Sequence, residues 1–564
     1  MKSKFFALAA LGGVLVLPQF VFPQVATAQQ LGADDTTSLE VDGKLVAPPA
    51  EEAVEDAEEE ASPLSWDFRV TNEFHAFDNL DLLPLKEDTP QDILDTDDRQ
   101  NFGYTSLAAG VSYDVREDTS FNLGAAVSGM WGNDQIGAST GFGGFAYIYD
   151  LSVDWAAFAN DDFALWTTIG RQSYSIGGAD KDYFFNDIID GITLNADFGV
   201  AGRLRLMFDV YGDSGRPDDV NFLRYISANK QTTNNFRGDT DIYRFGGVYE
   251  LLDMVKGVDL RAFGYGSAIG ALRTSSNSQT TGADISTQGV LGNFADQDYT
   301  MMFGARANYT YESDTLVAGV MGEYARSMGI DRKARRLGLY DVDTDGNAFG
   351  VGAHAGVDLG GYGVEGRFRF FRADGGNHSK AEGLPYSHGF VGMKGSQVGG
   401  INMSRYAGWR PSAYVSNSSG ISDNPQDLNR GAGTMSAHGG LGFLLGETMR
   451  LDLDGWYFQD TSETNFDVTR AREVGQDIAF GYSEAELAAQ ERFGKSLGTE
   501  LNATLTVSPN DVLSIYAIGG VFMPGEFYET RINRTAGTSL GAPGGDADNL
   551  ENFWVASAGA TLAF

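Results

Sequence analysis

The sequence contains no cysteine and only 14 prolines among 564 residues. Without cysteine the chain forms no disulfide bond and no thiolate metal site, and the cell envelope is one compartment where thiols are of no use. Basic residues are also scarce, because 40 Lys and Arg face 77 Asp and Glu, which gives a formal charge of -37. Nucleic acid binding needs a basic surface, so this balance argues against nucleic acid as a partner.

Long hydrophobic runs are absent beyond the first 28 residues. Residues 1–28 combine Lys2 and Lys4 with an apolar stretch and end on Ala26-Thr27-Ala28, the pattern of a secretory signal peptide. Pro18 and Pro23 break the apolar stretch, which argues against a membrane anchor. No later stretch supplies the roughly 20 consecutive apolar residues of a spanning helix. If the mature chain lies in a membrane, it therefore crosses it as strands.

Residues 29–63 hold eleven acidic residues against Lys44 alone, with almost no aromatic residues. Such a segment buries too little apolar surface to offset its chain entropy. We expect a disordered, acidic periplasmic tail. The alternative is a tether for a basic periplasmic partner.

From Leu64 to the C-terminus, apolar and polar residues alternate with a period of two, as in Leu107–Val115. This period indicates β-strands with one apolar face. The candidate strands are 64–77, 102–115, 120–132, 145–158, 163–172, 191–199, 203–211, 242–251, 257–266, 299–311, 315–325, 347–359, 361–372, 437–446, 449–459, 496–507, 511–522 and 552–564. We expect an all-β fold over 64–564, a transmembrane antiparallel up-and-down β-barrel of about 18 strands, with 16 to 20 left open.

The spacing of these strands separates a membrane barrel from a soluble one. Very short connections, such as 312–314 and 508–510, alternate with long ones rich in Gly, Asn, Asp and Ser. An up-and-down barrel of the bacterial outer membrane has this arrangement, with short periplasmic turns and long extracellular loops. An even strand number places both termini in the periplasm.

The final segment, 554–564, alternates in the same way and ends on Phe564. A last strand that ends on an aromatic residue resembles the assembly signal of outer-membrane barrels. We therefore expect the barrel-assembly machinery and outer-membrane lipid, including lipopolysaccharide, as partners. Trp131, Trp155, Trp166, Trp456 and Trp554 are predicted to belong to the aromatic girdles at the membrane interfaces.

In a membrane barrel the polar side of each strand faces the lumen, because an arginine facing lipid costs about 2–4 kcal/mol at the midplane. The alternation predicts the following pore-lining charges: Arg203, Arg205, Asp209, Arg244, Arg261, Arg306, Glu323, Glu365, Arg367, Arg369, Asp452 and Asp454. Asp114, Asp150 and Asp154 fall on the same side. These residues either pair across strands and stiffen the wall, or create a transverse field that filters solutes.

One local pattern carries a family resemblance. A candidate strand ends Ile169-Gly170-Arg171-Gln172, and the next begins Asp190-Gly191-Ile192. This pattern resembles the alginate-export porins, in which the intervening loop folds into the barrel and narrows the pore. The resemblance implies that role for 173–190 and places Arg171, Asp182, Asp187 and Asp190 at the constriction. Relatives tend to carry basic residues before the Asp-Gly, whereas this chain has Asn186-Asp187-Ile188-Ile189, which puts an acidic polysaccharide substrate in doubt.

Two loops carry further candidates. The loop over about 373–436 is either a basic, aromatic lid over the mouth or a variable surface loop, and the variable surface loop is the favoured interpretation. Asp341, Asp343 and Asp345 resemble the start of a calcium loop, but position twelve is Gly352 instead of Glu. A solvated acidic loop is the favoured interpretation there, and no metal or cofactor is expected.

The five histidines show no metal-ligand spacing and no nucleophile motif stands out, so we do not expect an enzyme. The predicted function is a porin for diffusion or selective passage of small polar or charged solutes, as a monomer or a homotrimer. The alternative is an adhesion or structural barrel protein whose long loops are the functional part.

Overall fold

The computed structural model describes residues 63–78, 100–131, 144–160, 163–179, 182–212, 242–269, 299–331, 342–375, 377–378, 386–387, 389–393, 434–461, 495–526 and 551–564. The expected signal peptide and nearly all of the acidic tail lie outside these ranges. Within them, no helix is long and apolar enough to cross a membrane.

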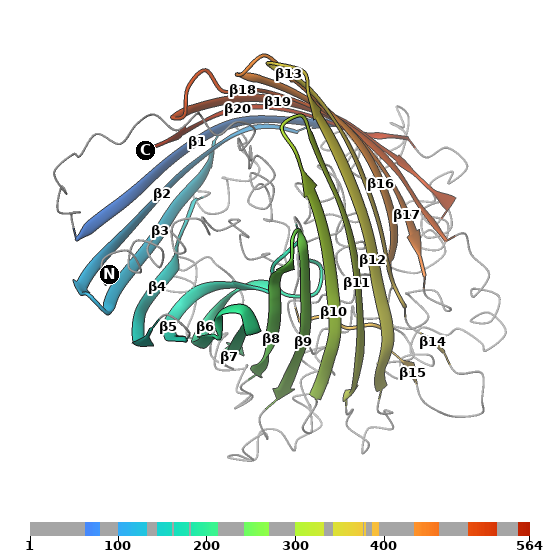
Figure 1. Cartoon of the computed structure of the whole chain (residues 1–564). Helices are drawn as coiled ribbons and strands as arrows, with labels where there is room; N and C mark the ends of the chain where they lie inside the picture. Colours follow the sequence, from blue (N-terminus) through green and yellow to red (C-terminus); the bar gives the residue numbers. More distant parts are fainter. Residues whose placement is uncertain are drawn as a thin grey trace, which may run out of the picture.

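The strands form one closed ring (Figure 1). The long strands are β1 (Leu64–Asp78), β2 (Gln100–Arg116), β3 (Thr119–Trp131), β4 (Gly144–Ala159), β5 (Ala164–Ser175), β6 (Asn186–Asp197), β7 (Arg203–Gly212), β8 (Ile242–Val255), β9 (Val258–Ile269), β10 (Tyr299–Glu312), β11 (Leu316–Asp331), β12 (Val342–Asp358), β13 (Tyr362–Ala373), β16 (Thr434–Leu445), β17 (Met449–Asp460), β18 (Ser496–Val507), β19 (Leu513–Pro524) and β20 (Phe553–Ala563). Two further strands of two residues each, β14 (Asn377–His378) and β15 (Tyr386–Ser387), lie between β13 and β16.

Every long strand pairs antiparallel with its neighbour in sequence, and β20 pairs with β1. The 18 long strands, without the short β14 and β15, form an up-and-down barrel, as the sequence predicts. Closure satisfies the backbone groups of both edge strands, because Arg69 of β1 lies opposite Ala563 of β20. The two described ends of the chain therefore lie at the same end of the barrel.

Connections alternate in length around the ring. The eight links β2–β3, β4–β5, β6–β7, β8–β9, β10–β11, β12–β13, β16–β17 and β18–β19 have two to five residues each. The β6–β7 link holds one short 3-10 helix, η2 (Gly199–Ala201). All eight lie at the end of the barrel where the described chain begins and ends, and the other end carries the long connections.

Several strand boundaries differ from the sequence prediction, and three of them concern candidate site residues. Strand β6 begins at Asn186 instead of Gly191, and β5 continues to Ser175, so the connection between them is shorter than expected. Strand β12 begins at Val342, within the stretch predicted as an acidic loop. The period-two signal fails at these places because Asn186-Asp187 and Asp343-Thr344-Asp345 are polar on both sides of the strand.

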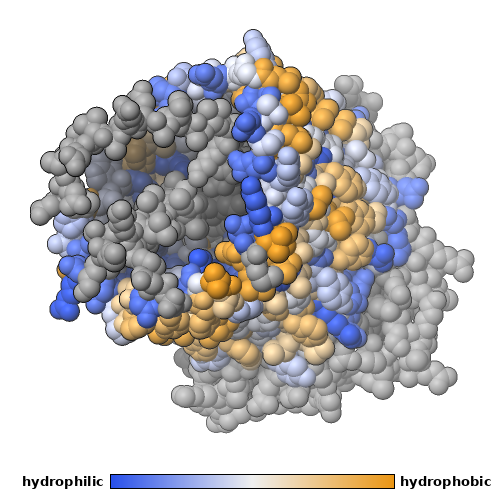
Figure 2. Space-filling view, in the orientation of Figure 1, coloured by the Kyte–Doolittle hydropathy of each residue, from blue (hydrophilic) through white to orange (hydrophobic). Residues whose placement is uncertain are grey.

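The outer face of the ring is apolar. Along β20, Trp554 and Leu562 are exposed on one side, whereas Phe553 and Val555 on the other are buried. The same alternation runs through β10, where Tyr299, Met301 and Phe303 are exposed and Met302 is buried. Figure 2 shows hydrophobic residues spread over the outside of the wall. A polypeptide in water rarely exposes so large an apolar surface, which indicates lipid as its surroundings.

The predicted aromatic girdle is partly wrong. Trp155 and Trp554 do lie on the outer face and are about half exposed. Trp456 is 8% exposed and alternates with the outward-facing Leu453 and Tyr457, so it points inward. Trp166 also faces inward, where the Arg203 guanidinium lies 5.7 Å from its ring centroid. The side chain of Trp131 lies outside the described residues.

Candidate functional site

The inner wall of the barrel carries the charged residues of the strands. Arg205 and Asp209 on β7 alternate with Leu206 and Phe208, which are exposed on the outer face. The same alternation places these predicted residues on the inner side: Arg203, Arg205, Asp209, Arg244, Arg261, Arg306, Glu323, Glu365, Arg367, Arg369, Asp452 and Asp454.

The link between β5 and β6 lies against this inner wall. We call residues 176–179 and 182–185 the inward segment. Its backbone carbonyls accept hydrogen bonds from inward side chains of two strands: Arg205 on β7 donates to Ile176 at 2.6 Å, and Asn308 on β10 donates to Gly178. Such contacts exist only if the segment enters the ring, and Figure 1 shows this link curling toward β8 and β9.

Asp182 fixes the inward segment at its centre. Arg306 Nη2 lies 3.0 Å from Asp182 Oδ1 and 2.7 Å from Glu323 Oε2, and the Arg306 and Glu323 side chains are fully buried. Asp182 also accepts the backbone N–H groups of Gly177, Phe184 and Phe185. One carboxylate thus shapes the turn of the segment and anchors it to β10.

Gly178 shows how closely the segment approaches the wall. Its φ is +76°, a region that favours glycine. A Cβ at this position would also overlap the Arg261 guanidinium. Any side chain at Gly178 would therefore require the Arg261 guanidinium or the segment to shift.

A second carboxylate group holds the start of β6. Arg244 on β8 contacts Asp209 at 2.6 Å and Asp187 at 2.8 Å, and all three side chains are at least 97% buried. Charged groups so deeply buried are stable only as a paired cluster. Arg244 also donates to the backbone carbonyl of Met393 at 3.1 Å.

Met393 belongs to residues 389–393, which we call the clamp segment, from the long connection between β13 and β16. Its backbone N–H donates to Phe184 of the inward segment at 3.0 Å. The Phe184 and Phe390 rings are 5.7 Å apart at their centroids. Val391 donates its N–H to Ser327 on β11. Part of the long loop therefore lies inside the ring and covers the inward segment, which the sequence did not indicate.

Apolar side chains fill the space between these two segments and the wall. Tyr183, Phe184, Phe185 and Phe390 are nearly inaccessible and belong to one cluster with Phe371 and Tyr265. The Arg369 guanidinium lies 4.2 Å from the Tyr183 ring centroid, a cation–π contact. The inward and clamp segments thus pack against the wall as a small hydrophobic core inside the barrel.

The remaining arginines on this part of the wall are paired as well. Glu250 accepts from Arg205 at 3.1 Å and from Arg261 at 3.0 Å. Arg369 contacts Glu323 at 3.2 Å. The cross-strand pairing predicted as one account of the lumen charges is thus present here.

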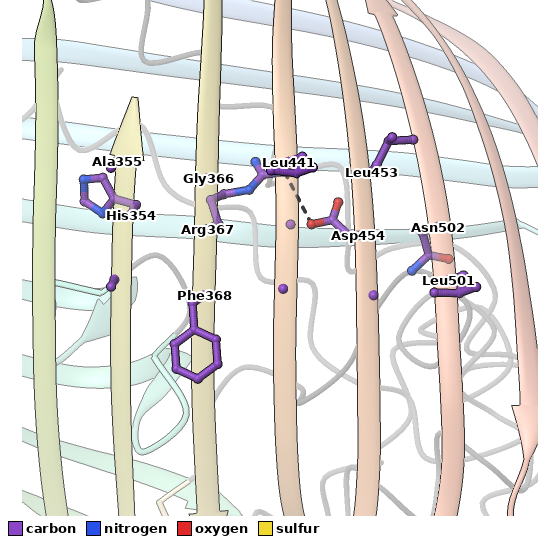
Figure 3. A pocket seen from close by; sticks show the side chains of 14 residues that line it. His354, Ala355, Gly366, Arg367, Phe368, Leu441, Leu453, Asp454, Leu501 and Asn502 are labelled. Carbon is purple, nitrogen blue, oxygen red and sulfur yellow. Dashed lines mark hydrogen bonds and ion pairs between the residues drawn. The ribbon is translucent and has the colours of Figure 1, made fainter. Parts of the chain in front are cut away.

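A more accessible group of charges lies on β13, β16 and β17. Arg367 contacts Asp452 at 2.7 Å and Asp454 at 3.3 Å, while Arg450 contacts Glu365 at 2.7 Å. The two guanidinium side chains are 27% and 28% exposed, in contrast to Arg306. Figure 3 shows Arg367 and Asp454 facing each other across β16, beside His354 and Asn502. A Cβ at Gly440, between them on β16, would overlap the Asp454 carboxylate.

His438 completes this group. Its Nε2 lies 2.7 Å from Asp454 Oδ1, and its ring stacks on Trp456 at 4.1 Å between centroids. Trp456 is therefore part of the lumen wall, not of a membrane girdle. Trp456 falls on the same side of the two-residue alternation as Asp452 and Asp454, so the sequence already indicates that it faces the lumen.

Across the ring, the inner side of β3, β4 and β5 carries a polar network without an arginine. Asp154 accepts from Asn122 at 2.7 Å and from Thr168. Ser152 donates to Asp150 at 2.6 Å. Asp114 on β2 lies on the same face of the sheet as Ser112, which bonds to Asn122.

Two predicted constriction residues, Arg171 and Asp190, lie where β5 and β6 leave their other neighbours in the ring, because the β4–β5 pairing ends at Arg171 and the β6–β7 pairing begins at Gly191. Arg171 and Asp190 are cross-strand partners and form a bidentate ion pair of 2.7 and 2.6 Å. Their side chains are 26% and 33% exposed, and Ile188, two residues before Asp190, packs against Ala108, Ala126 and Tyr149. Their place at the constriction stays a prediction. Gly170 and Gly191 are the neighbouring pair of cross-strand partners. The Gly-Arg and Asp-Gly dipeptides that carry the family resemblance therefore lie opposite each other on β5 and β6.

The candidate calcium residues are also placed differently. Asp345 lies in β12 and pairs with Arg326 at 3.1 Å at an exposed position. Asp343 is in the same strand, and Asp341 lies outside the described residues. A strand cannot wrap around an ion as a calcium loop does. No cluster of metal-ligating side chains occurs within the described part of the chain.

Comparisons with known proteins give a distant likeness only. No family model and no curated protein matches the chain. Among solved structures, Pseudomonas putida OprB covers 89% of this chain and 94% of its own length at 10% identity and a TM-score of 0.38. OprD of Pseudomonas aeruginosa covers the same shares at 12% identity and a TM-score of 0.41. Pseudomonas aeruginosa OccK2 (OpdF), solved in complex with glucuronate, gives 10% identity and a TM-score of 0.41. At these values the barrel assignment rests on the strand pairing itself.

Proposed function

We propose that the chain is a porin through which small polar or charged solutes cross a bacterial outer membrane. The observation that carries the proposal is the contrast between the two faces of the same strands. On β13, Arg367 is paired and partly exposed on the inner side, whereas Phe368 is half exposed on the outer side. Charged inner groups need water around them, and a ring of 18 strands has room for it.

The outer-membrane location is supported by strand length and polarity. The described long strands have 10 to 17 residues, whereas a tilted strand needs about 9–11 to cross the hydrocarbon layer. Their outer side is apolar and closed, which suits lipid. The short turns mark the periplasmic end, and the two described chain ends lie there.

We further propose that the inward segment and the clamp segment narrow the lumen. Both are fixed to one side of the ring, β7 to β13, by buried ion pairs and by a hydrophobic cluster. Solutes then pass between these segments and the opposite strands, past the accessible group around Arg367 and Arg450.

Single-channel recording in a planar bilayer tests this function. Wild-type protein should give stable conductance, and replacement of residues 177–184 by two glycines should raise it, because the space that these residues occupy becomes open. The double variant R326A/D345A removes an ion pair from the outer face and serves as the control, with unchanged conductance. Heat-modifiable gel migration shows that each barrel is folded. A folded wild-type barrel without conductance would reject the porin proposal in favour of an adhesion or structural role.

A further inference from the structure

The arginines of the inner wall are neutralised where they are most numerous. Around the inward segment, five guanidinium groups belong to Arg205, Arg244, Arg261, Arg306 and Arg369. Six carboxylates lie among them: Asp182, Asp187, Asp209, Glu250, Asp259 and Glu323. The group therefore has one more negative than positive charge.

The inward segment and the start of β6 together change the sign of this group. The wall strands alone contribute the five arginines against Asp209, Glu250, Asp259 and Glu323. The wall residues alone therefore have one more positive than negative charge. Asp182 and Asp187 add two negative charges, and their ion pairs with Arg306 and Arg244 are almost fully buried. These arginines have neither free charge nor exposed surface to offer to a passing anion.

The accessible charges are also mainly acidic. On β13 and β17, Arg367 and Arg450 face Glu365, Asp452 and Asp454, a balance of two against three. Across the ring, β4 lies nine strands from β13. There the inner side of β1 to β4 holds Asp67, Glu73, Asp114, Asp150 and Asp154 against Arg69, and Arg116 ends β2 at the turn. The network around Asp154 uses neutral donors, Asn122 and Thr168, which leave the carboxylate charge in place.

Resting on the proposed porin function, we infer that the channel prefers cations, with the β2–β4 carboxylates facing the open part of the lumen. Fixed charges act on mobile ions within about a Debye length, roughly 10 Å at 0.1 M salt. Acidic linings select cations for this reason. The preference requires no bound ion, only an excess of carboxylates along the path. The channel would prefer solutes with an ammonium or guanidinium group for the same reason.

Reversal potentials in a potassium chloride gradient at low ionic strength test the inference on the refolded full chain. Wild-type protein should give a potassium-to-chloride permeability ratio above unity, and the ratio should fall as the salt concentration rises. The variant D150N/D154N should lower the ratio several-fold, since it removes two lumen carboxylates and keeps their hydrogen-bonding shape. The matched control D345N/D374N removes two carboxylates near the outer rim and should leave the ratio unchanged.

The outcomes separate the two proposals. A conducting wild-type channel with a ratio at or below unity would overturn the cation preference and leave the porin function standing. A cation preference that survives in D150N/D154N would overturn the role of these carboxylates. Absence of conductance in a folded barrel would reject the porin function, and the cation preference with it.

Discussion

Arg306 of β10 and Asp182 of the inward segment form an ion pair of 3.0 Å in which neither side chain is more than 2% exposed. The pair joins a strand of the wall to a connection 124 residues earlier in the chain. It also shares its cation with Glu323 of β11. One guanidinium group therefore ties the centre of the inward segment to two strands of the wall.

Replacement of Arg306 by alanine leaves Asp182 and Glu323 without their cation. Loss of one partner from a buried pair costs about 3–5 kcal/mol, and release of the inward segment into water relieves part of this cost. Because the chain has no cysteine, a single cysteine at Ala179 reports the release by thiol labelling. We expect much faster labelling of A179C in R306A than in the unchanged background. R326A, at the exposed pair with Asp345, is the control, and equal labelling in R306A and R326A would contradict the anchor.

Trp456 and Trp155 should report opposite surroundings. Trp456 stacks on His438 in the lumen, whereas Trp155 is 48% exposed on the outer face. In variants that retain one of the seven tryptophans, we expect brominated lipids to quench the fluorescence of Trp155 strongly and that of Trp456 little. Iodide in the aqueous phase is the complementary quencher. Strong lipid quenching of Trp456 would show that the assigned orientation of β17 is wrong.

Arg171 and Asp190 should behave as a coupled pair across β5 and β6. Their two short hydrogen bonds are of the bidentate type. Single replacement by leucine leaves one partly buried charge without its partner, and we expect each single variant to unfold at lower urea concentration. The double variant R171L/D190L should recover most of the loss, as apolar replacement of an ion pair often does. Additive losses in the double-mutant cycle would show that the pair is not coupled.

Phe564 should matter for assembly more than for the final stability. Its backbone exchanges hydrogen bonds with Phe68 of β1 at 2.9 and 3.2 Å, and its ring is 60% exposed on the outer face. The ring therefore packs little within the barrel. We expect F564A to insert more slowly than wild type in liposomes that contain the barrel-assembly machinery, and F564Y to match wild type. Equal insertion rates for F564A and wild type would remove Phe564 as an assembly signal.

The sequence predicted the barrel well because strand alternation is a local property. Leu107–Val115 and 554–564 show their two faces without knowledge of any partner. The short links add the order of strands, since consecutive antiparallel strands pair. The closed ring of 18 follows from these two signals.

The interior was harder to predict because it depends on contacts between distant segments. Nothing in the sequence around Met393 indicates that it bonds to Phe184 and Arg244. Trp456 was misplaced because its aromatic type, and not strand parity, assigned it to the membrane interface. Parity places it with Asp454. The neutralisation of Arg244 and Arg306 follows only from the position of Asp182 and Asp187.

The most direct test of the central claim is single-channel conductance of the folded wild-type chain in a planar bilayer. We predict discrete, stable conductance steps that persist at both polarities, because the inner wall is charged and partly exposed around Arg367 and Arg450. A barrel shown to be folded by heat-modifiable migration, yet electrically silent under the same conditions, would contradict the assignment of this chain as a porin.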